Sequence, residues 1–297
     1  MPEKQNRRTL IKNVVLGSAV LAGSGTLLSS FSCETADTKN MSLKGAINHS
    51  VCYWTYNFLS VEELCKAIKN IGFSAMDLVG PKDWPTLQKY NVYSSMCYTA
   101  GENSIAKGWN DTSQHARLIK DFTEIIPLMV KAGYKDVITF SGNRNGMDDE
   151  TGLKNCANGL KQVMSLAEKN GITIQMELLN SKVNHKDYMC DKTPWGVELC
   201  KRIGSPNFKL LYDIYHMQID EGDVIRTLTD NQQYIGHYHT GGVPGRHEIN
   251  ETQELYYPAI MQAIVKTGFK GYVAQEFIPA NTDKLASLRE AVKICDV

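Results

Sequence analysis

Four polar side chains end or follow apolar segments in the second half of the chain, in the order Glu177, Asp213, His239 and Glu276. If these segments are strands of a barrel, the four side chains face one opening at its carboxyl end. Three carboxylates and an imidazole around one point repel unless a cation lies among them. Mixed oxygen and nitrogen ligands suit one divalent ion: Mn²⁺, Mg²⁺, Co²⁺ or Zn²⁺. The pattern predicts a metal site, although each residue alone could be a cap or an ion-pair partner.

Other polar residues lie near the ends of the same kind of segment. Asn180 and His185 follow Glu177 in what should be the next loop, and His49 ends the first apolar segment after the N-terminal region. Amide and imidazole groups exchange hydrogen bonds with hydroxyl and carbonyl oxygens. We therefore predict that these three residues contact a substrate.

Short apolar runs alternate with amphipathic segments from Lys44 onward, and these elements would position the polar residues. The expected strands cover 45–49, 75–79, 92–98, 137–140, 172–177, 208–212, 234–238 and 271–276. The expected helices cover 61–71, 84–90, 111–132, 150–169, 194–203, 221–230, 255–267 and 284–294. Eight strand–helix units predict a single-domain (β/α)8 TIM barrel over residues 44–297, an ordinary length for that fold. A doubly wound sheet is disfavoured because no GxGxxG follows any strand.

Two details refine the expected helices. Pro127 lies inside the segment 111–132 and predicts a kink or a restart there. Glycines end four helices and lead into the next strand, which is typical of a left-handed C-terminal cap: Gly72, Gly133, Gly171 and Gly268.

Charge balance and cysteine spacing disfavour several classes of protein. Basic and acidic residues each total 32, so the formal net charge is zero, and we expect no nucleic-acid partner because such surfaces carry a basic excess. The eight cysteines include no CxxC pair, which disfavours a zinc ribbon or a thioredoxin-type site. Several lie in apolar patterns, so we expect mostly free, structural thiols.

The first 33 residues have the composition of a targeting segment. Arg7 and Arg8 precede an uncharged, Gly- and Ser-diluted apolar stretch, which predicts a twin-arginine export signal over 1–33, with a plain membrane anchor as the alternative. Cys33 ends a loose lipoprotein cleavage box, so the export product is either periplasmic or anchored through a lipidated Cys33. Residues 34–43 read as a polar tether.

Three motifs carry a resemblance to a known family. YDIYHMQIDEGD (212–223), VPGRHE (243–248) and YVAQEFIP (272–279) resemble the hydroxypyruvate isomerase family, within the xylose-isomerase-like TIM barrels. The similarity is strong over about 172–279 and weaker over 44–140, where it rests on the rhythm of the strands. The strand-six motif and the VPGRHE run together are quite specific for the family.

The resemblance implies one divalent metal held by the same four strand-end residues. It also implies that Glu177 and Glu276 form the acid–base pair, that His216 contacts a substrate oxygen and that Arg246 binds the anionic or hydroxyl end. One residue departs from the family: the isomerases place a glutamine where this chain has His239. A histidine ligand there is more typical of the ketose epimerases.

These residues predict proton transfer beside a carbonyl of a small sugar or keto acid. A metal bound to that carbonyl acidifies the neighbouring C–H and stabilises the enediolate, and a carboxylate moves the proton. The leading hypothesis is an isomerase of the hydroxypyruvate isomerase family. The alternatives are a ketose 3-epimerase, an inosose-dehydratase-like lyase and a non-catalytic carbohydrate-binding barrel. Export favours a free or glycan-derived sugar as substrate, and the sequence is compatible with a homo-oligomer.

Overall fold

The computed structural model describes residues 41–102 and 104–297. The predicted export signal, 1–33, and residues 34–40 of the predicted tether lie outside the described residues. At the end of the tether, Met41 and Leu43 lie partly buried against the hydrophobic core. None of the helices in the described ranges is long and apolar enough to cross a membrane.

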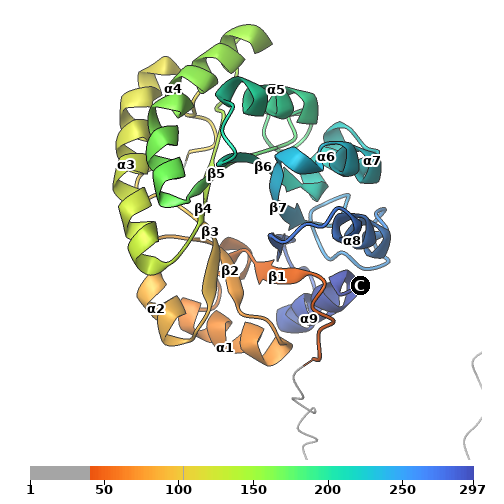
Figure 1. The fold of residues 1–297 in the computed structure, drawn as a ribbon. Helices are drawn as coiled ribbons and strands as arrows, with labels where there is room; N and C mark the ends of the chain where they lie inside the picture. The colour runs from red at the N-terminus through yellow and green to blue at the C-terminus, as the bar shows by residue number, and fades with distance from the viewer. Residues whose placement is uncertain (1–40, 103) are drawn as a thin grey trace, which may run out of the picture. The chain divides into compact units, whose positions relative to one another are not determined.

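Eight parallel strands form one sheet that curls into a nearly closed barrel (Figure 1). The order is β1-β8-β7-β6-β5-β4-β3-β2, and a parallel bridge between Cys52 and Asp77 joins the two ends of this order. The strands are β1 (Asn48–Val51), β2 (Ala75–Val79), β3 (Tyr93–Cys97), β4 (Asp136–Thr139), β5 (Thr173–Glu177), β6 (Phe208–Asp213), β7 (Ile235–Thr240) and β8 (Tyr272–Gln275). The predicted (β/α)8 barrel is confirmed.

Helices surround the barrel in the described part of the chain (Figure 1). They are α1 (Val61–Ile71), α2 (Trp84–Lys89), α3 (His115–Ala132), α4 (Asp149–Asn170), α5 (Thr193–Ile203), α6 (Ile214–Asp220), α7 (Val224–Asp230), α8 (Tyr257–Lys266) and α9 (Lys284–Cys295). Short 3-10 turns cover Tyr53–Tyr56, Thr112–Gln114 and Gln232–Tyr234. Buried apolar side chains form a continuous core, and all seven described cysteines are buried and free, as predicted.

Two predicted helices differ from the observed ones. The helix expected over 221–230 is α7. The sequence pattern did not predict α6, which follows β6 without a loop. Asp213 ends the strand and also caps α6, because its side chain accepts a hydrogen bond from the backbone N–H of His216. The restart predicted at Pro127 is wrong: α3 continues to Ala132, with Pro127 on its exposed side while Ile126 and Met129 are buried in the core.

Local capping chemistry sets the helix ends. Positive φ is confirmed at all four predicted glycines: Gly72, Gly133 and Gly171 are the C-caps of their helices, and Gly268 directly follows Thr267, the C-cap of α8. Side chains form a capping box at the start of α1, where Ser60 accepts from the backbone N–H of Glu63 and the Glu63 carboxylate accepts from that of Ser60.

We expect Ser60→Ala to lower the free energy of unfolding by about 1 kcal/mol, because it removes the acceptor for the Glu63 N–H. Denaturant unfolding measures the change. Ser165→Ala, at an exposed position inside α4, is the matched control and should not destabilise, since alanine is the better helix former. Equal stability of the wild type and Ser60→Ala would contradict the capping role.

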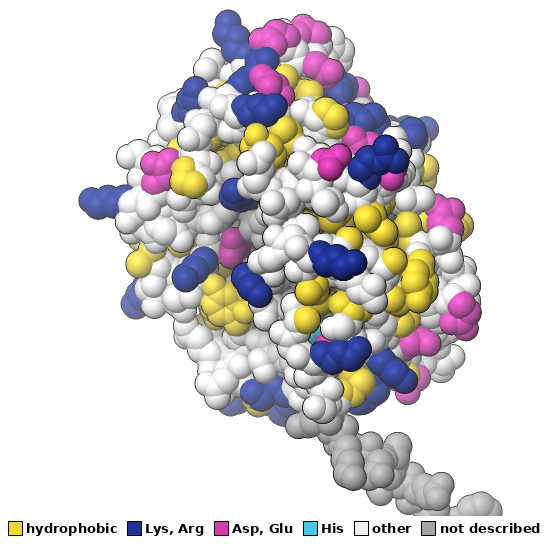
Figure 2. Space-filling view, turned by 45° about the vertical axis from the view of Figure 1, so that its right-hand side comes forward, with side chains coloured by type: hydrophobic (Ala, Val, Ile, Leu, Met, Phe, Trp, Pro, Cys, Tyr) yellow, Lys and Arg dark blue, Asp and Glu magenta, His cyan; other side chains and the backbone are white. Residues whose placement is uncertain are grey.

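On the face that Figure 2 shows, lysine and arginine side chains are interspersed with acidic ones. No single sign of charge dominates that face.

Candidate metal centre at the carboxyl end of the barrel

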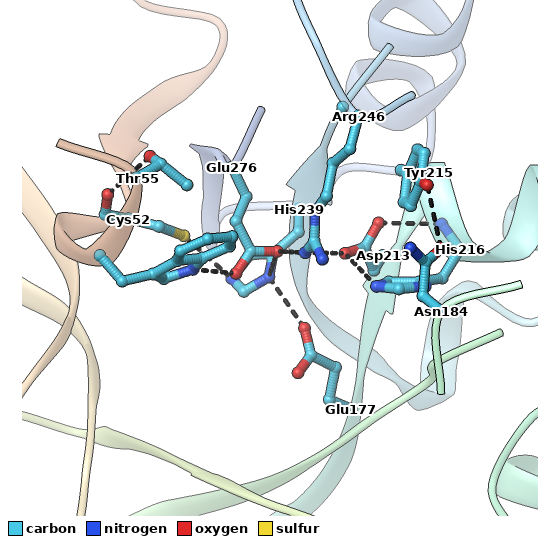
Figure 3. A network of polar contacts seen from close by, with 12 residues as sticks. Cys52, Thr55, Glu177, Asn184, Asp213, Tyr215, His216, His239, Arg246 and Glu276 are labelled. Atoms are coloured by element: carbon cyan, nitrogen blue, oxygen red, sulfur yellow. Dashed lines mark hydrogen bonds and ion pairs between the residues drawn. The ribbon is translucent and has the colours of Figure 1, made fainter. Parts of the chain in front are cut away.

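Four neighbouring strands bring the predicted ligands together (Figure 3). Glu177 ends β5, Asp213 ends β6, His239 lies in β7 beside Asp213, and Glu276 directly follows β8. Each offers a ligand atom, and these atoms all lie within 4.8 Å of one another. All four residues are buried, with exposures of at most 4%. Parallel strands of similar length end at one rim, which is why residues far apart in sequence meet here.

Nδ1 of His239 is the imidazole atom that faces the carboxylates. It lies 3.0 Å from Oε1 of Glu177 and 2.8 Å from Oε2 of Glu276. Arg246 supplies a second cationic group: its Nη2 lies 2.5 Å from Oε2 of Glu276 and 3.3 Å from Oδ2 of Asp213. One imidazole and one guanidinium thus stand among three carboxylates.

The three carboxylates have different electrostatic environments. Burial and the charge of Glu276 raise the pKa of Asp213 to about 8, against the opposing effect of Arg246. Burial also raises the pKa of Glu177, although its contact with His239 opposes this. For Glu276 burial acts in the same direction, but the charges of His239 and Arg246 outweigh it and hold the pKa of Glu276 well below its usual range. Additional positive charge at this point would favour ionisation of all three.

Arg246 is held in a fixed position by a tight turn of the VPGRHE segment. Its backbone has φ +60°, its N–H bonds to the Gly242 carbonyl at 2.8 Å, and its own carbonyl accepts from the N–H of Ile278 at 2.6 Å. The guanidinium lies between the rings of Trp54 and Tyr215, 5.3 Å from each centroid. This contact on both faces is favourable for a cation. The Nε atom of Arg246 is buried and has no hydrogen-bond partner among the described residues.

His216, at the start of α6, has one nitrogen occupied and one free. Its Nδ1 lies 3.1 Å from the backbone N–H of Asn180 and 2.6 Å from that residue's side-chain amide. Because Nδ1 accepts, the proton of a neutral ring is on Nε2. That buried Nε2 has no hydrogen-bond partner in the described structure and lies 3.6 Å from Oδ2 of Asp213, so it is a donor aimed at the centre.

The predicted loop residues Asn180 and His185 both lie next to His216. The His185 ring is 5.2 Å from the His216 ring, and its backbone N–H bonds to the Asn180 carbonyl at 3.1 Å. Burial lowers the pKa of His185, and the nearby charge of Arg246 adds to this effect. The loop after β5 therefore supports one side of the centre.

His49 is the predicted contact that the structure does not bring to the centre. Strand residues alternate in direction, and Ser50 points inward, where it bonds to Asp77. His49 points outward instead: it lies 6.4 Å from the Phe73 ring and 3.8 Å from the carboxylate of Asp296, near the chain end. The prediction of a substrate contact at His49 is corrected accordingly.

Two residues join the centre that the four-ligand pattern does not contain. The indole N–H of Trp54 donates to Oε1 of Glu276 at 2.7 Å. Asp77 reaches the other side of His239, with its Oδ2 3.1 Å from Nε2. The signal for Asp77 was present in the sequence, since it is a lone carboxylate within the apolar run 75–79.

The chain is similar to known proteins over most of its length. The family described as xylose isomerase-like TIM barrel matches residues 65–295. A 2-oxo-tetronate isomerase of Pectobacterium atrosepticum is 25% identical over 248 residues, covering 80% of this chain and 92% of that protein. A human protein named as a hydroxypyruvate isomerase is 30% identical over 104 residues. The match covers 35% of this chain and 38% of that protein.

Epimerases and solved barrels also match. A D-psicose 3-epimerase of Ruminiclostridium cellulolyticum is 29% identical over 121 residues, 39% of this chain and 38% of that protein. In several further relatives the match spans less than half of their length. The structure of an AP endonuclease, family 2, from Brucella melitensis superimposes with a TM-score of 0.73 at 22% identity, covering 82% of this chain and 96% of that one. That likeness shows the fold alone.

Proposed function

Because the chain belongs to the xylose isomerase-like TIM barrel family, we propose that it is a divalent-metal-dependent isomerase of the hydroxypyruvate isomerase type. Its named relatives are isomerases and epimerases, which supports an isomerase or epimerase. The proposed reaction moves a proton between adjacent carbons of a small sugar or keto acid. The observation that carries the proposal is the buried meeting of Glu177, Asp213, His239 and Glu276.

These four side chains suit a divalent ion. Their ligand atoms lie within 4.8 Å of one another, and they combine hard carboxylate oxygens with one imidazole nitrogen. The raised pKa values of Asp213 and Glu177 mark a site with an excess of buried carboxylate. The three carboxylates and Nδ1 of His239 would hold the ion. When bound, it would polarise a substrate carbonyl and acidify the neighbouring C–H.

Glu177 and Glu276 are the proposed acid–base pair. Both lie beside one atom, Nδ1 of His239, at 3.0 and 2.8 Å, so one substrate can be within reach of both. The Trp54 indole and the Arg246 guanidinium hold Glu276 in position. One carboxylate removes the proton beside the carbonyl, and the same or the other carboxylate returns it.

His216 and Arg246 are the proposed substrate-binding residues. The Nε2–H of His216 is buried and has no hydrogen-bond partner in the described structure, although Oδ2 of Asp213 lies 3.6 Å away, so it can donate to a substrate oxygen without breaking a hydrogen bond. Arg246 has an Nε–H with no hydrogen-bond partner among residues 41–102 and 104–297, and its charge suits a carboxylate or a hydroxyl group. Asn180 orients His216 through its Nδ1, and His185 lies against the same ring.

A ketose 3-epimerase is the second candidate. It is favoured by His239, because the isomerases of this type have a glutamine at that position, and by the similarity to a D-psicose 3-epimerase. Both reactions use the same pair of carboxylates. They differ in whether the proton returns to the neighbouring carbon or to the opposite face of the same carbon.

We also propose that the chain acts outside the cytoplasm. The proposal rests on the twin-arginine-type segment at Arg7 and Arg8, with periplasmic release or anchoring through a lipidated Cys33. An exported enzyme meets free or glycan-derived sugars, so we propose such a sugar as the physiological substrate. Turnover of hydroxypyruvate far above that of every ketose would contradict this choice.

A panel of substrates in D₂O tests the function. We expect the full chain, supplied with Mn²⁺, to incorporate deuterium beside the carbonyl of one member of a panel of ketohexoses, 2-oxo-tetronate and hydroxypyruvate. NMR of the product then separates a shifted carbonyl, which indicates isomerisation, from an inverted neighbouring centre, which indicates epimerisation. If no compound acquires deuterium, the proposed function is wrong.

A further inference from the structure

A second layer of polar residues lies inside the barrel next to the carboxylate centre. It consists of Ser50 on β1, Asp77 on β2, Ser95 on β3 and His237 on β7, all of them buried. Barrel interiors are normally filled by branched apolar side chains. A buried carboxylate costs several kcal/mol unless hydrogen bonds and opposite charges offset the loss of hydration. Asp77 therefore calls for a specific explanation.

Every oxygen of Asp77 is occupied. Oδ1 accepts from the hydroxyl groups of Ser50, at 2.8 Å, and of Ser95, at an even shorter distance. Oδ2 lies 2.6 Å from Nε2 of His237 and 3.1 Å from Nε2 of His239. Burial opposes ionisation, but these two imidazoles lower the pKa of Asp77 below its usual value. Asp77 is thus a charged acceptor for which every neighbour acts as a donor.

The backbone of β2 is distorted at this residue. The pairing register between β2 and β3 shifts on both sides of Asp77, and the next residue, Leu78, has φ +58°. A leucine in the left-handed region is strained, and a bulge redirects the side chain beside it. Such strain persists where the surrounding structure requires one particular side-chain direction. Here that direction points Asp77 at His239.

The contact decides which nitrogen of His239 carries the proton. Both ring nitrogens face carboxylates, but a metal among Glu177, Asp213 and Glu276 would take the lone pair of Nδ1, and the hydrogen of the ring would then stay on Nε2, where Asp77 accepts it. Nδ1 is the atom beside Glu177 and Glu276. We propose that Asp77 is a positioning residue that holds the proton on Nε2 of His239 and so presents Nδ1 as a ligand to the metal centre. The inference rests on the proposed function, because it assigns His239 as a ligand.

A second ion bound by Cys52, Asp77 and His239 is the competing explanation, since ligand atoms of these residues also lie within 4.8 Å of one another. The contacts disfavour it. Asp77 already has donors on both oxygens, and Nε2 of His239 needs its hydrogen for Asp77.

Asp77→Asn tests the proposal with Co²⁺ alone as the probe. The asparagine amide can donate to Nε2, which reverses the tautomer and turns Nδ1–H towards the carboxylates. We expect calorimetric titration of the ion-free full chain to show a Kd for Co²⁺ raised 10- to 100-fold. Ser95→Ala, which also removes a hydrogen bond from Asp77 but leaves the His239 contact, should raise Kd less than about 3-fold. Equal effects of the two variants, or none, would overturn the proposal.

A measurement on the wild type covers the case in which Asp77→Asn does not fold. In the Zn²⁺-loaded chain with ¹⁵N-labelled histidine, we expect His239 to carry a slowly exchanging proton on Nε2, with its signal assigned from the spectrum of His239→Gln. A proton-free Nε2 would refute the positioning role. If the wild type binds neither ion, the proposed metal site fails instead. The spectrum of the ion-free chain, at a pH where His239 is neutral, then tests the same tautomer independently.

Discussion

Glu276→Gln is expected to lower kcat about 10³-fold, within the range that a positioned acid or base contributes. Glutamine keeps the shape of Glu276 and an oxygen for the Trp54 indole and the Arg246 guanidinium, but it cannot take up a proton. Turnover at saturating substrate measures the effect. Metal content of the same sample shows whether a ligand or only the proton acceptor was lost.

Three further variants strengthen this experiment. Glu177→Gln should cause a comparable loss, and the double variant should lose far less than the product of the two, because the pair acts as a unit on one proton. Glu254→Gln makes the same chemical change at an exposed position, where the side chain accepts a hydrogen bond from Gln218, and should leave kcat within about twofold. A Glu276→Gln enzyme that keeps its metal and more than a tenth of its activity would contradict the acid–base role.

Removal of divalent ions is expected to abolish turnover and to lower Tm. When the free ion concentration is about 100 times Kd, binding adds about 2.7 kcal/mol to the free energy of unfolding. For a domain of this size that corresponds to roughly 5–10 °C in Tm. The physical reason is the concentration of Glu177, Asp213 and Glu276 in one buried centre. Chelation followed by calorimetry and assay, then readdition of Mn²⁺, Mg²⁺, Co²⁺ or Zn²⁺ one at a time, measures both effects and ranks the ions.

Asp213→Asn provides the matched control for the stability effect. It removes one carboxylate while keeping the shape and the cap of α6. We expect this variant to show a smaller change of Tm on chelation, because its affinity for the ion is reduced. If the wild type keeps both its Tm and its activity after complete chelation, the four-ligand assignment is wrong and a binding barrel becomes the better account.

Most of the fold was predictable because helices and strands leave local signals. The helix over Val61–Ile71 and the strand over Ala75–Val79 have the predicted bounds, since apolar spacing and a following turn mark both ends. The errors occur where two local signals conflict. Asp213 both ends β6 and caps α6. No loop separates the two elements, so the sequence contains no turn signal before α6. Pro127 is tolerated because it lies on the exposed side of a helix whose other side is buried.

The positions of Glu177, Asp213, His239 and Glu276 near the ends of neighbouring strands could be predicted from local patterns, because strand ends are local features and a barrel gathers them at one rim. Only the tertiary structure decided which atoms meet. The direction of His49 depends on the alternation of its strand, which is set by the pairing of β1 rather than by residue type.

Asp77 shows most clearly what local patterns leave out. Its partner His239 lies 162 residues later in the chain, on β7, which is not a neighbour of β2 in the sheet. Local patterns describe how often side chains recur along one segment. Such patterns do not predict how the barrel closes. They also do not predict the bulge at Leu78, which directs the Asp77 carboxylate inward. The types of the four proposed ligand residues could therefore be read from the sequence, whereas the directions of their side chains depend on the assembled barrel.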